Sequence, residues 1–541
     1  MGYNEATVNG REEILSMRAV CADFWRDIKA SARRFSEFTK CHKGVIAILT
    51  LALIFLYGQE IFYYDISIDS EIALSSQAEI LNSWVAIDRF GLVLTKKLFG
   101  LTRFVPAASN LLMVLTLGFS AFFFDFCIQE WKDQEQSYKL FYYIFPVAYV
   151  SAPCLAEQFY FSLQSFEIAW AGFLCILAVY CVSRRIIFRE SMLWILPGIF
   201  MMIWAFGSYQ AFVSLFITVT LISFLICYQN HRIEFQKSWG WFFCGFKYIA
   251  VFAVGFIAYG LTSKLMRIYY HLDSSYVDNM FGWKTVGISA ALNNIKGDAE
   301  RIYRAVWSTF FPKLFLPVLI LCLILLIFRG WRMHRKGFLM YLIAAGLLAL
   351  SPLFLTIISG SYQPIRGQIV FPFVYAFCLA AITTFQKKAI SYLCCIGAAL
   401  ASLHQGQIMT QLFHTSYMTY EQDKSLAASL YESIEQTGTD AGLDTYTVVF
   451  VGNRSANLPQ DSLRGDVIGH SFFEWDATGY AGSTNRIIGF CDTLGYDMAV
   501  PTEEQAQRAN QLAPEMPVWP ASGSVRAADE IIVIRLSSCM T

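Results

Sequence analysis

The sequence is poor in charged residues. Asp, Glu, Lys and Arg make up 15% of its 541 residues, whereas soluble domains contain about 25%. The 41 basic and 41 acidic residues cancel, so the chain has no net charge that would attract nucleic acid. Hydrophobic residues reach 56% and gather in many long apolar runs. These features exclude an ordinary soluble domain and predict a polytopic α-helical membrane protein.

Common cofactor and metal motifs are also missing. The chain contains no P-loop, no Rossmann glycine pattern, no HExxH and no GxSxG. Most of the fourteen cysteines lie inside apolar runs, and none has a CxxC or Cys/His spacing that would bind a metal. Cys491 and Cys539, near the C-terminus, could form a disulfide or remain two free thiols. The sequence therefore gives no indication of ATP, a nicotinamide cofactor or zinc.

Long apolar segments recur through the first three-quarters of the chain. A helix that crosses a bilayer needs about 20 mostly apolar residues. On this criterion we predict about eleven spans, of which the third and the fifth are short. The segments lie near residues 44–64, 104–127, 140–154, 163–183, 191–207, 210–228, 243–263, 313–329, 338–358, 369–386 and 389–407.

Basic residues predict how these segments are oriented, because cytoplasmic loops carry an excess of Lys and Arg. Such residues follow the second, fourth, sixth, eighth and tenth segments, and others precede the first. We therefore expect residues 1–43 to form a cytoplasmic N-terminal segment. The outer face would then carry the long connections 65–103 and 264–312, together with the tail that follows the eleventh span.

The predicted domains are a transmembrane domain at 44–407 and an outer α/β domain at 408–541. Within the outer domain, residues 446–452 and 529–537 are β-branched, apolar runs of strand length. Residues 486–496 fit either a helix or a strand. The outer domain could dock the acceptor of a reaction, or it could act as a lid or a scaffold.

One helix of the outer domain has a recognisable start. Thr502 is followed three residues later by Gln505, the spacing of a capping box. Pro514 cannot continue a helix and marks its end. We predict a helix over residues 502–513.

Three carboxylates follow the first apolar segment, in the stretch IFYYDISIDSE at 61–71. Asp65, Asp69 and Glu71 lie where the chain leaves the lipid, and acids there are costly unless solvated, paired or used in chemistry. One interpretation is a general base, or acids that hold a metal, at the membrane boundary. The other is a hydrated loop that happens to be acidic.

The same outer connection contains an amphipathic pattern. Apolar residues recur at three- and four-residue spacing from Ile80 to Leu98, which predicts one helix lying in the interface plane. It could cap a cavity open to the bilayer, or simply pack on the bundle. Arg89, just off this stripe, has the planar guanidinium that suits a phosphate. Alternatively, it could pair with Asp88 or Asp69.

Further polar residues lie near the predicted outer ends of spans. Arg366 is the only charged residue in the loop SGSYQPIRGQ, so we expect it to bind phosphate or to pair with the acidic loop. In the connection 264–312, cations occur among aromatic residues, which suits a sugar phosphate and equally an interfacial belt. Glu167, at the start of a span, could be functional or part of satisfied packing. The remaining substrate-binding candidates are Gln158, Gln164, Tyr209, Gln210, Lys264, Arg267 and Arg304.

Several of these stretches resemble the bacterial GtrII-type glucosyltransferases, membrane enzymes of the GT-C kind. The resemblance lies in SIDSE, in the LNSWVAIDRFGLVLTKKL that follows, and in SYQAF at 208–212. In the tail, VVFVGN, IGHSFFEWD, MPVWPASGSV and IIVIRLS resemble one branch of the family. No single motif is very specific, but their order and topology together are.

The resemblance implies a reaction. A hexose, usually glucose, would pass from a polyprenyl phosphate in the bilayer to a cell-surface polysaccharide on the outer face of a bacterial inner membrane. Asp69 or Glu71 would be the general base, and arginine or lysine would stabilise the departing phosphate. No cofactor would be required, although a divalent metal is compatible with the chemistry. The alternative is a transporter or flippase of a lipid-linked saccharide, in which the acids form a coupling site.

Overall fold

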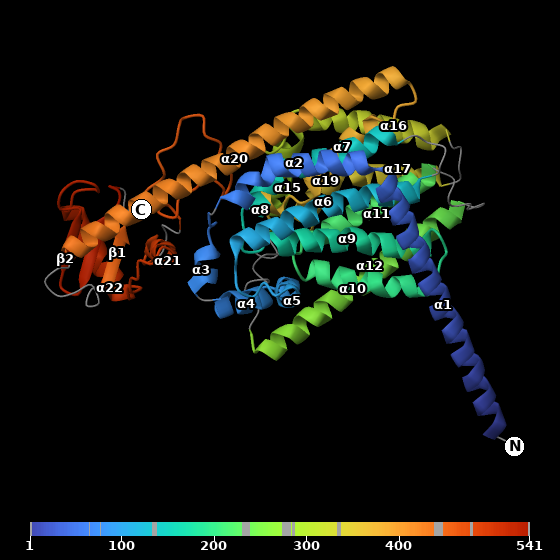
Figure 1. Ribbon diagram of the computed structural model, residues 1–541, viewed down its shortest axis with the longest axis horizontal. Coiled ribbons are helices and arrows are strands. Elements are labelled where there is room, and N and C mark those ends of the chain that lie inside the picture. The colour runs from blue at the N-terminus through green and yellow to red at the C-terminus, as the bar shows by residue number, and fades with distance from the viewer. Residues whose placement is uncertain are drawn as a thin grey trace.

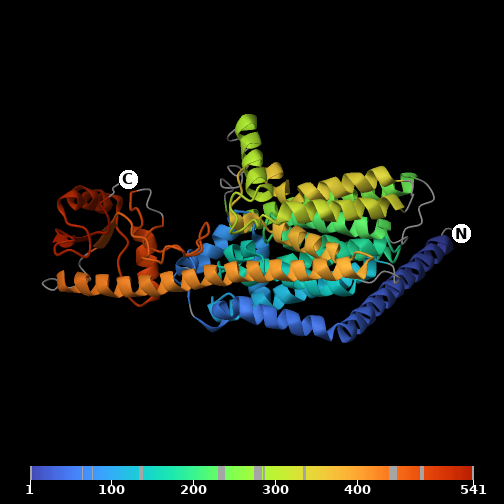
Figure 2. The same cartoon turned by 90° about the horizontal axis from the view of Figure 1, so that it is seen from above.

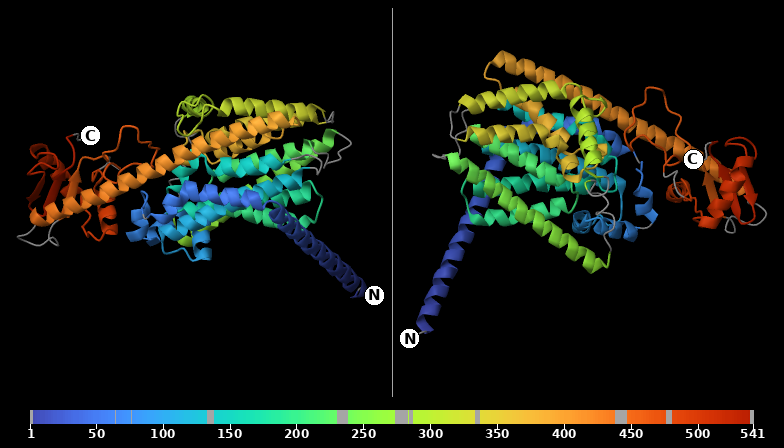
Figure 3. Two further views of the ribbon diagram at one scale, coloured as in Figure 1. Left: turned by 45° about the horizontal axis from the view of Figure 1, so that its top comes forward. Right: turned by 180° about the vertical axis from the view of Figure 1, so that it is seen from behind.

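The computed structural model describes ten stretches of the chain. At one end of a helical bundle the N-terminal helix α1 (Tyr3–Cys41) projects away, and at the other end lies a small domain formed by the C-terminal residues (Figures 1 and 3). The described residues are 3–63, 65–75, 77–132, 138–229, 238–272, 283, 287–332, 337–437, 447–475 and 480–538.

Each of the eleven predicted apolar segments falls on helix. Within the described residues, eight helices are long and apolar enough to cross a membrane. They are α2 (Lys43–Phe62), α6 (Pro106–Trp131), α9 (Ser165–Ile186), α11 (Phe212–Gln229), α12 (Ser238–Tyr270), α16 (Phe315–Arg332), the unit Phe338–Ser359 that combines α17 (Phe338–Leu350), η2 (Ser351–Leu353) and α18 (Phe354–Ser359), and α20 (Lys388–Thr437).

The three other predicted spans differ from a single long helix. The third consists of α7 (Lys139–Val150) and α8 (Pro153–Phe159), which meet at 48°. The fifth and tenth are the shorter apolar helices α10 (Ile195–Phe206), preceded by η1 (Met192–Trp194), and α19 (Val370–Ile382). The helices thus support a polytopic membrane protein, and the count of eleven stays a prediction.

Burial separates the centre of the bundle from its lipid-facing surface. In α9 and α11, 83% of the most apolar stretch of 18 residues is buried, whereas in α12 only 22% of the corresponding stretch is. Large apolar side chains on α12, such as Ile249, Ile257 and Leu261, are exposed. Exposed apolar surface on this scale marks contact with another apolar phase, here the acyl chains of a bilayer.

The helix α20 connects the bundle to the C-terminal domain without a break (Figure 2). Its 50 residues extend for about 75 Å at 1.5 Å per residue, more than twice the hydrocarbon thickness of about 30 Å. Its far end packs into the C-terminal domain through Ala427, Leu430 and Ile434. The predicted boundary at residues 407 and 408 therefore lies inside a continuous helix.

The C-terminal domain has a three-stranded sheet of order β1-β3-β2. β1 (Thr447–Val451) and β3 (Ile531–Arg535) are parallel and confirm the two predicted strands, while β2 (Val525–Ala528) pairs antiparallel with β3. The segment that fitted helix or strand is the helix α21 (Thr484–Thr493). The predicted capping box begins α22 (Glu503–Leu512), which is followed by η5 (Ala513–Glu515).

The predicted amphipathic helix is broken, and in this respect the prediction was wrong. The chain forms α3 (Ser70–Ser75), α4 (Gln77–Ala86) and α5 (Phe90–Phe99), with Asp88 in the left-handed region at φ 64° between α4 and α5. The break lets the backbone N–H of Gly91 donate to the carbonyl of Gly207 at 2.6 Å. A Cβ at position 91 would lie 2.4 Å from the Ser208 hydroxyl, so glycine permits this close contact.

Candidate functional site

The acidic stretch after the first span meets an arginine from the C-terminal domain. Asp69 precedes α3 with φ 71°, and Glu71 lies in the first turn of that helix. On α21, which packs against α3 (Figure 1), Arg486 donates from Nη1 to Asp69 Oδ1 at 3.0 Å and also to Glu71 Oε1. One guanidinium therefore binds two carboxylates more than 400 residues earlier in the sequence.

The two carboxylates differ sharply in their access to solvent. The Asp69 side chain is 48% exposed, whereas that of Glu71 is 2% exposed and that of Arg486 is 11% exposed. Gly489 on α21 lies directly over Glu71, because a Cβ there would be 3.0 Å from Glu71 Cγ. An incoming hydroxyl could therefore reach Asp69, while Glu71 is enclosed.

Burial raises the pKa of Glu71 to about 7, and this effect outweighs Arg486, which lowers it. Asp65 is likewise buried, and burial raises its pKa to about 7. Its carboxyl is close enough to Glu60, at the end of α2, for the two charges to repel. The three predicted acids thus include one exposed carboxylate and two that are enclosed.

Arg89 is held by the turn that SYQAF forms. Its guanidinium lies over the ring of Tyr209, 4.8 Å from the ring centroid, and such stacking fixes the plane of the group. Gln210 donates from Nε2 to the Ile87 carbonyl at 3.0 Å. The structure therefore brings these three predicted residues together around the break between α4 and α5.

Asp88 binds residues of α12. Its Oδ1 accepts a hydrogen bond from the Ser263 hydroxyl at 2.5 Å and lies 3.4 Å from Nε of Arg267. The predicted pairing alternatives for Arg89 were Asp88 and Asp69. Among the described residues, Asp88 forms a salt bridge with Arg267, and Asp69 forms one with Arg486. Arg267 thus helps to hold the turn, whereas the neighbouring Lys264 is exposed.

Glu167 belongs to a buried ion pair. Its Oε1 lies 2.9 Å from Nζ of Lys96, and the two side chains are 0% and 4% exposed. Next to Lys96, Thr95 accepts a hydrogen bond from the indole N–H of Trp204 at 2.9 Å. These contacts fasten α5 to α9 and α10, which supports the packing interpretation of Glu167.

Arg366 lies in η3 (Ile365–Gly367), the turn before α19. It is half-buried, with its guanidinium 5.2 Å from the centroid of the Phe161 ring. Within the described part of the chain it has no ion pair, although it is close enough to Glu157 to act on that carboxylate electrostatically. Its predicted pairing with the acidic loop is absent among these residues, since Arg486 occupies Asp69 and Glu71.

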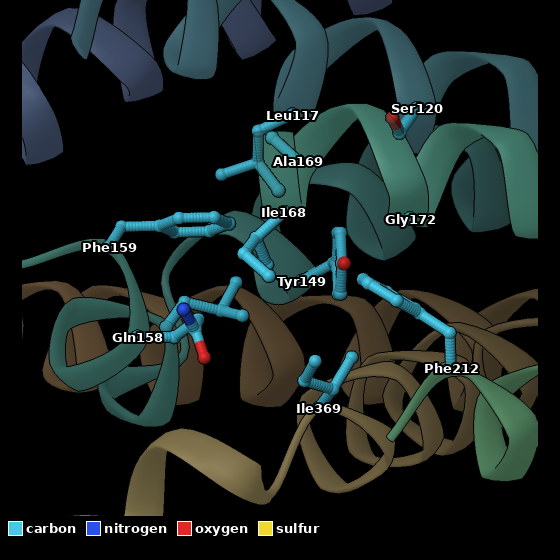
Figure 4. Close-up of a pocket in the computed structure, with 11 residues that line it drawn as sticks. Leu117, Ser120, Tyr149, Gln158, Phe159, Ile168, Ala169, Gly172, Phe212 and Ile369 are labelled. Carbon is cyan, nitrogen blue, oxygen red and sulfur yellow. The ribbon is translucent and has the colours of Figure 1, made fainter. Parts of the chain in front are cut away.

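Gln158 is buried beside a small apolar cavity, where Tyr149, Phe159, Phe212 and Ile369 are among the lining residues (Figure 4). The cavity has room for about one water molecule, which is too little for a hexose. Among the described residues, Nε2 of Gln158 has no hydrogen-bond partner. Gln158 is therefore a buried residue beside a cavity that is too small for the sugar it was predicted to bind.

The two remaining candidates are Gln164 and Arg304. Gln164 is half-buried at the start of α9, and its Oε1 has no hydrogen-bond partner within the residues that the structure covers. Arg304 follows α15 (Gly287–Tyr303) and is 74% exposed, 3.7 Å from Glu300. Across the described stretches, no three His, Cys, Asp or Glu side chains are grouped so that they could hold a metal ion. Cys539, of the suggested disulfide, lies outside the described residues.

Sequence reasoning missed Arg486. It lies in a segment that fitted helix or strand equally, with no acidic neighbour to draw attention to it. Reading 486–496 as a helix would have placed an arginine on a face of the outer domain, but nothing local identifies its partners. This contact is the main contribution of the tertiary structure to the site.

Comparison with known families gives one match. The family described as glucosyl transferase GtrII matches residues 60–385, more than half of the chain. This region contains every predicted site residue, from Asp65 to Arg366, but it ends before Arg486. No curated protein and no solved structure matches the chain. On the extent of the family match, the chain belongs to the GtrII glucosyl transferase family.

Proposed function

We propose that the protein transfers a hexose, usually glucose in this family, from a polyprenyl phosphate to a cell-surface glycan. The transfer would take place at the outer face of the membrane in which the protein lies. The observation that carries the proposal is the half-exposed carboxylate of Asp69, at the end of a span inside the family region. A carboxylate in this position can meet an acceptor from water and a donor whose tail stays in lipid.

Asp69 is the better candidate for the general base, because a base must come within hydrogen-bond reach of the proton that it removes. Asp69 would take the proton of an acceptor hydroxyl as that oxygen attacks the anomeric carbon. The bond from this carbon to the phosphate oxygen breaks, and polyprenyl phosphate leaves with the electron pair. Attack from the opposite side inverts the anomeric carbon.

Glu71 has a different role in this proposal. Its side chain is almost fully enclosed, and it binds the arginine that also binds Asp69. A carboxylate in such a place cannot receive a proton directly from a bulky sugar. Glu71 would instead hold the Asp69–Arg486 pair in one arrangement.

The departing phosphate needs positive charge, and Arg366 and Arg89 are the candidates best placed for it. Both guanidinium groups lie against aromatic rings, which limits the directions in which they can donate. Arg366 is half-buried, so its charge is less screened than that of the exposed Lys264 or Arg304. Arg267 would act by holding the turn that carries Arg89.

The bilayer end of the donor would lie along exposed apolar helices. Leu94 and Leu98 on α5, and Leu261 and Leu265 on α12, are exposed. α4 packs against both α5 and α12, so these surfaces lie on helices that share a neighbour. A polyprenyl chain in the membrane could therefore reach the turn around Arg89 without leaving the lipid. We propose that the protein lies in the inner membrane of a bacterium, with the C-terminal domain outside.

The test uses purified protein in liposomes with polyprenyl-phosphate glucose and a surface polysaccharide. A transferase releases polyprenyl phosphate only when the acceptor is present, and the polysaccharide gains a hexose that mass spectrometry detects. A flippase moves the intact donor and leaves both molecules unchanged. Movement of the donor without any sugar transfer would contradict the proposal, and family membership favours the first outcome.

A further inference from the structure

We propose that Arg486, in the C-terminal domain, is a positioning residue of the transfer site that aims Asp69 at the acceptor. This inference rests on the proposed function and extends it, because Arg486 lies beyond the family match. The site would then be complete only when the C-terminal domain is docked. The domain would thus act as a scaffold for the chemistry, and it need not bind the acceptor itself.

The geometry of the contact supports a positioning role for Arg486. Arg486 Nη1 binds Asp69 and Glu71 at the same time, so the guanidinium ties an exposed carboxylate to an enclosed one. Asp69 is in the left-handed region, which non-glycine residues rarely occupy and which surrounding contacts must maintain. The bond to Arg486 is such a contact, and it constrains the direction of the Asp69 side chain.

The charges of the three side chains also favour this contact. Asp69 and Glu71 are like charges, and Glu71 is removed from solvent, so an uncompensated pair would be strongly unfavourable. Within the described residues, the charged groups that act on Glu71 are Asp69, before α3, and Arg486, from the opposing α21. The guanidinium therefore favours the charged form of Glu71 against the effect of its burial.

The C-terminal domain is held in place independently of this contact. The Glu157 carboxylate at α8 accepts hydrogen bonds from the backbone N–H groups of Val467 at 2.5 Å and Ile468 at 3.3 Å. Close by, Asp466 Oδ2 accepts from the Ile365 N–H at 2.6 Å. A Cβ at Gly465 would lie 2.1 Å from Glu157 Oε2, so only glycine allows this approach.

The same segment is also fixed to the long helix α20. Asp423 accepts hydrogen bonds from the Ser471 hydroxyl at 2.6 Å and from the Phe472 N–H at 2.8 Å. Thr419 donates to the Gly469 carbonyl at 3.3 Å. Residues 465–472 are therefore held from α8 and from α20, and this docking sets the position of the domain that carries Arg486.

The experiment compares full-length wild-type protein with Arg486→Gln and Arg486→Lys in liposomes. We expect Arg486→Gln to lower kcat about 10- to 100-fold and to move the acidic limb of the pH–rate profile to higher pH. The direction follows because Arg486 lowers the pKa of Glu71, which burial has already raised to about 7. Arg486→Lys keeps one charge but lacks the fork geometry, so it should recover only part of the rate.

Two further variants separate positioning from simple attachment. Arg508→Gln removes an exposed arginine of the same domain, 3.8 Å from Asp529, and should leave rate and profile unchanged. Gly465→Ala should lower the fraction of molecules in which the domain is docked, so the rate should fall at every pH. The docked molecules keep Arg486 on Glu71, so the acidic limb should not move. If Arg486→Gln behaves like Gly465→Ala, Arg486 is only an attachment point and the proposal is overturned.

A second measurement does not depend on sugar transfer. Carbodiimide modifies protonated carboxyls, and mass spectrometry of the treated protein reports Asp69 and Glu71 separately. At pH 7, Arg486→Gln should increase modification of Glu71 severalfold, whereas Arg508→Gln should not. Unchanged modification would refute the link between Arg486 and the carboxylates. Increased modification in a protein that transfers no hexose would confirm the link and overturn the proposed function instead.

Discussion

Two groups of oppositely charged side chains differ in what surrounds them. Lys96 and Glu167 are almost fully enclosed, and they join helices that both belong to the family region. Arg486 joins Asp69 and Glu71 across two domains, and one member of this group remains half exposed. Enclosed pairs fasten helices, whereas a group that keeps one carboxylate open to water can also exchange a proton with a substrate.

The largest expected effect on hexose transfer comes from changing Asp69, the exposed carboxylate of the group that Arg486 forms with Asp69 and Glu71. We predict that Asp69→Asn lowers hexose transfer about 10²- to 10⁴-fold, the usual contribution of a general base. Glu71→Gln should lower it less, because Glu71 is enclosed and acts through Arg486. Rates and the amount of membrane-inserted protein would be measured together, with Asp529→Asn as the exposed control. If Glu71→Gln is the more damaging variant, the base has been assigned to the wrong carboxylate.

Breaking the enclosed pair of Lys96 and Glu167 should lower the stability of the folded protein. Lys96→Met leaves the Glu167 carboxylate buried without its cation, and breaking a buried pair in this way costs about 3–5 kcal/mol. Lys97→Met is a matched control, because Lys97 is exposed on the same helix. Thermal unfolding in detergent should show a large decrease in Tm for Lys96→Met and little change for the control. Equal decreases would mean that the enclosed pair does not fasten α5.

A smaller effect is expected at the arginine that we assign to the phosphate. Arg366→Gln should remove about 1.5–3 kcal/mol of charge-assisted hydrogen bonding to the donor, mainly as a higher KM for polyprenyl-phosphate glucose. The measurement is a donor titration at saturating acceptor. An unchanged KM and kcat would remove Arg366 from the binding site.

The smallest effect should occur at Arg304. This exposed side chain faces Glu300 in a surface pair, and such pairs contribute about 0–1 kcal/mol. We predict that Arg304→Gln changes KM and kcat less than twofold, which also makes it the matched control for Arg366→Gln. A larger loss of donor binding would show that the phosphate lies nearer α15 than we propose.

Local patterns accounted for most of the secondary structure. The apolar segments predicted helices, the β-branched runs predicted β1 and β3, and Thr502 with Gln505 predicted the start of α22. The prediction of one helix from Ile80 to Leu98 was wrong, because the spacing continues through a break that packing imposes. The close contact of Gly91 with Gly207 involves another helix, so no pattern within the segment reports it.

The sequence by itself determined the membrane class and the family, and it predicted the two carboxylates of the candidate site. Each depends on composition or on residues close together in the chain. Only the tertiary structure decided that Asp69 is exposed, that Glu71 is enclosed and that Arg486 binds both. The physical reason is that burial and ion pairing depend on distances in space, and 415 residues separate Glu71 from its arginine.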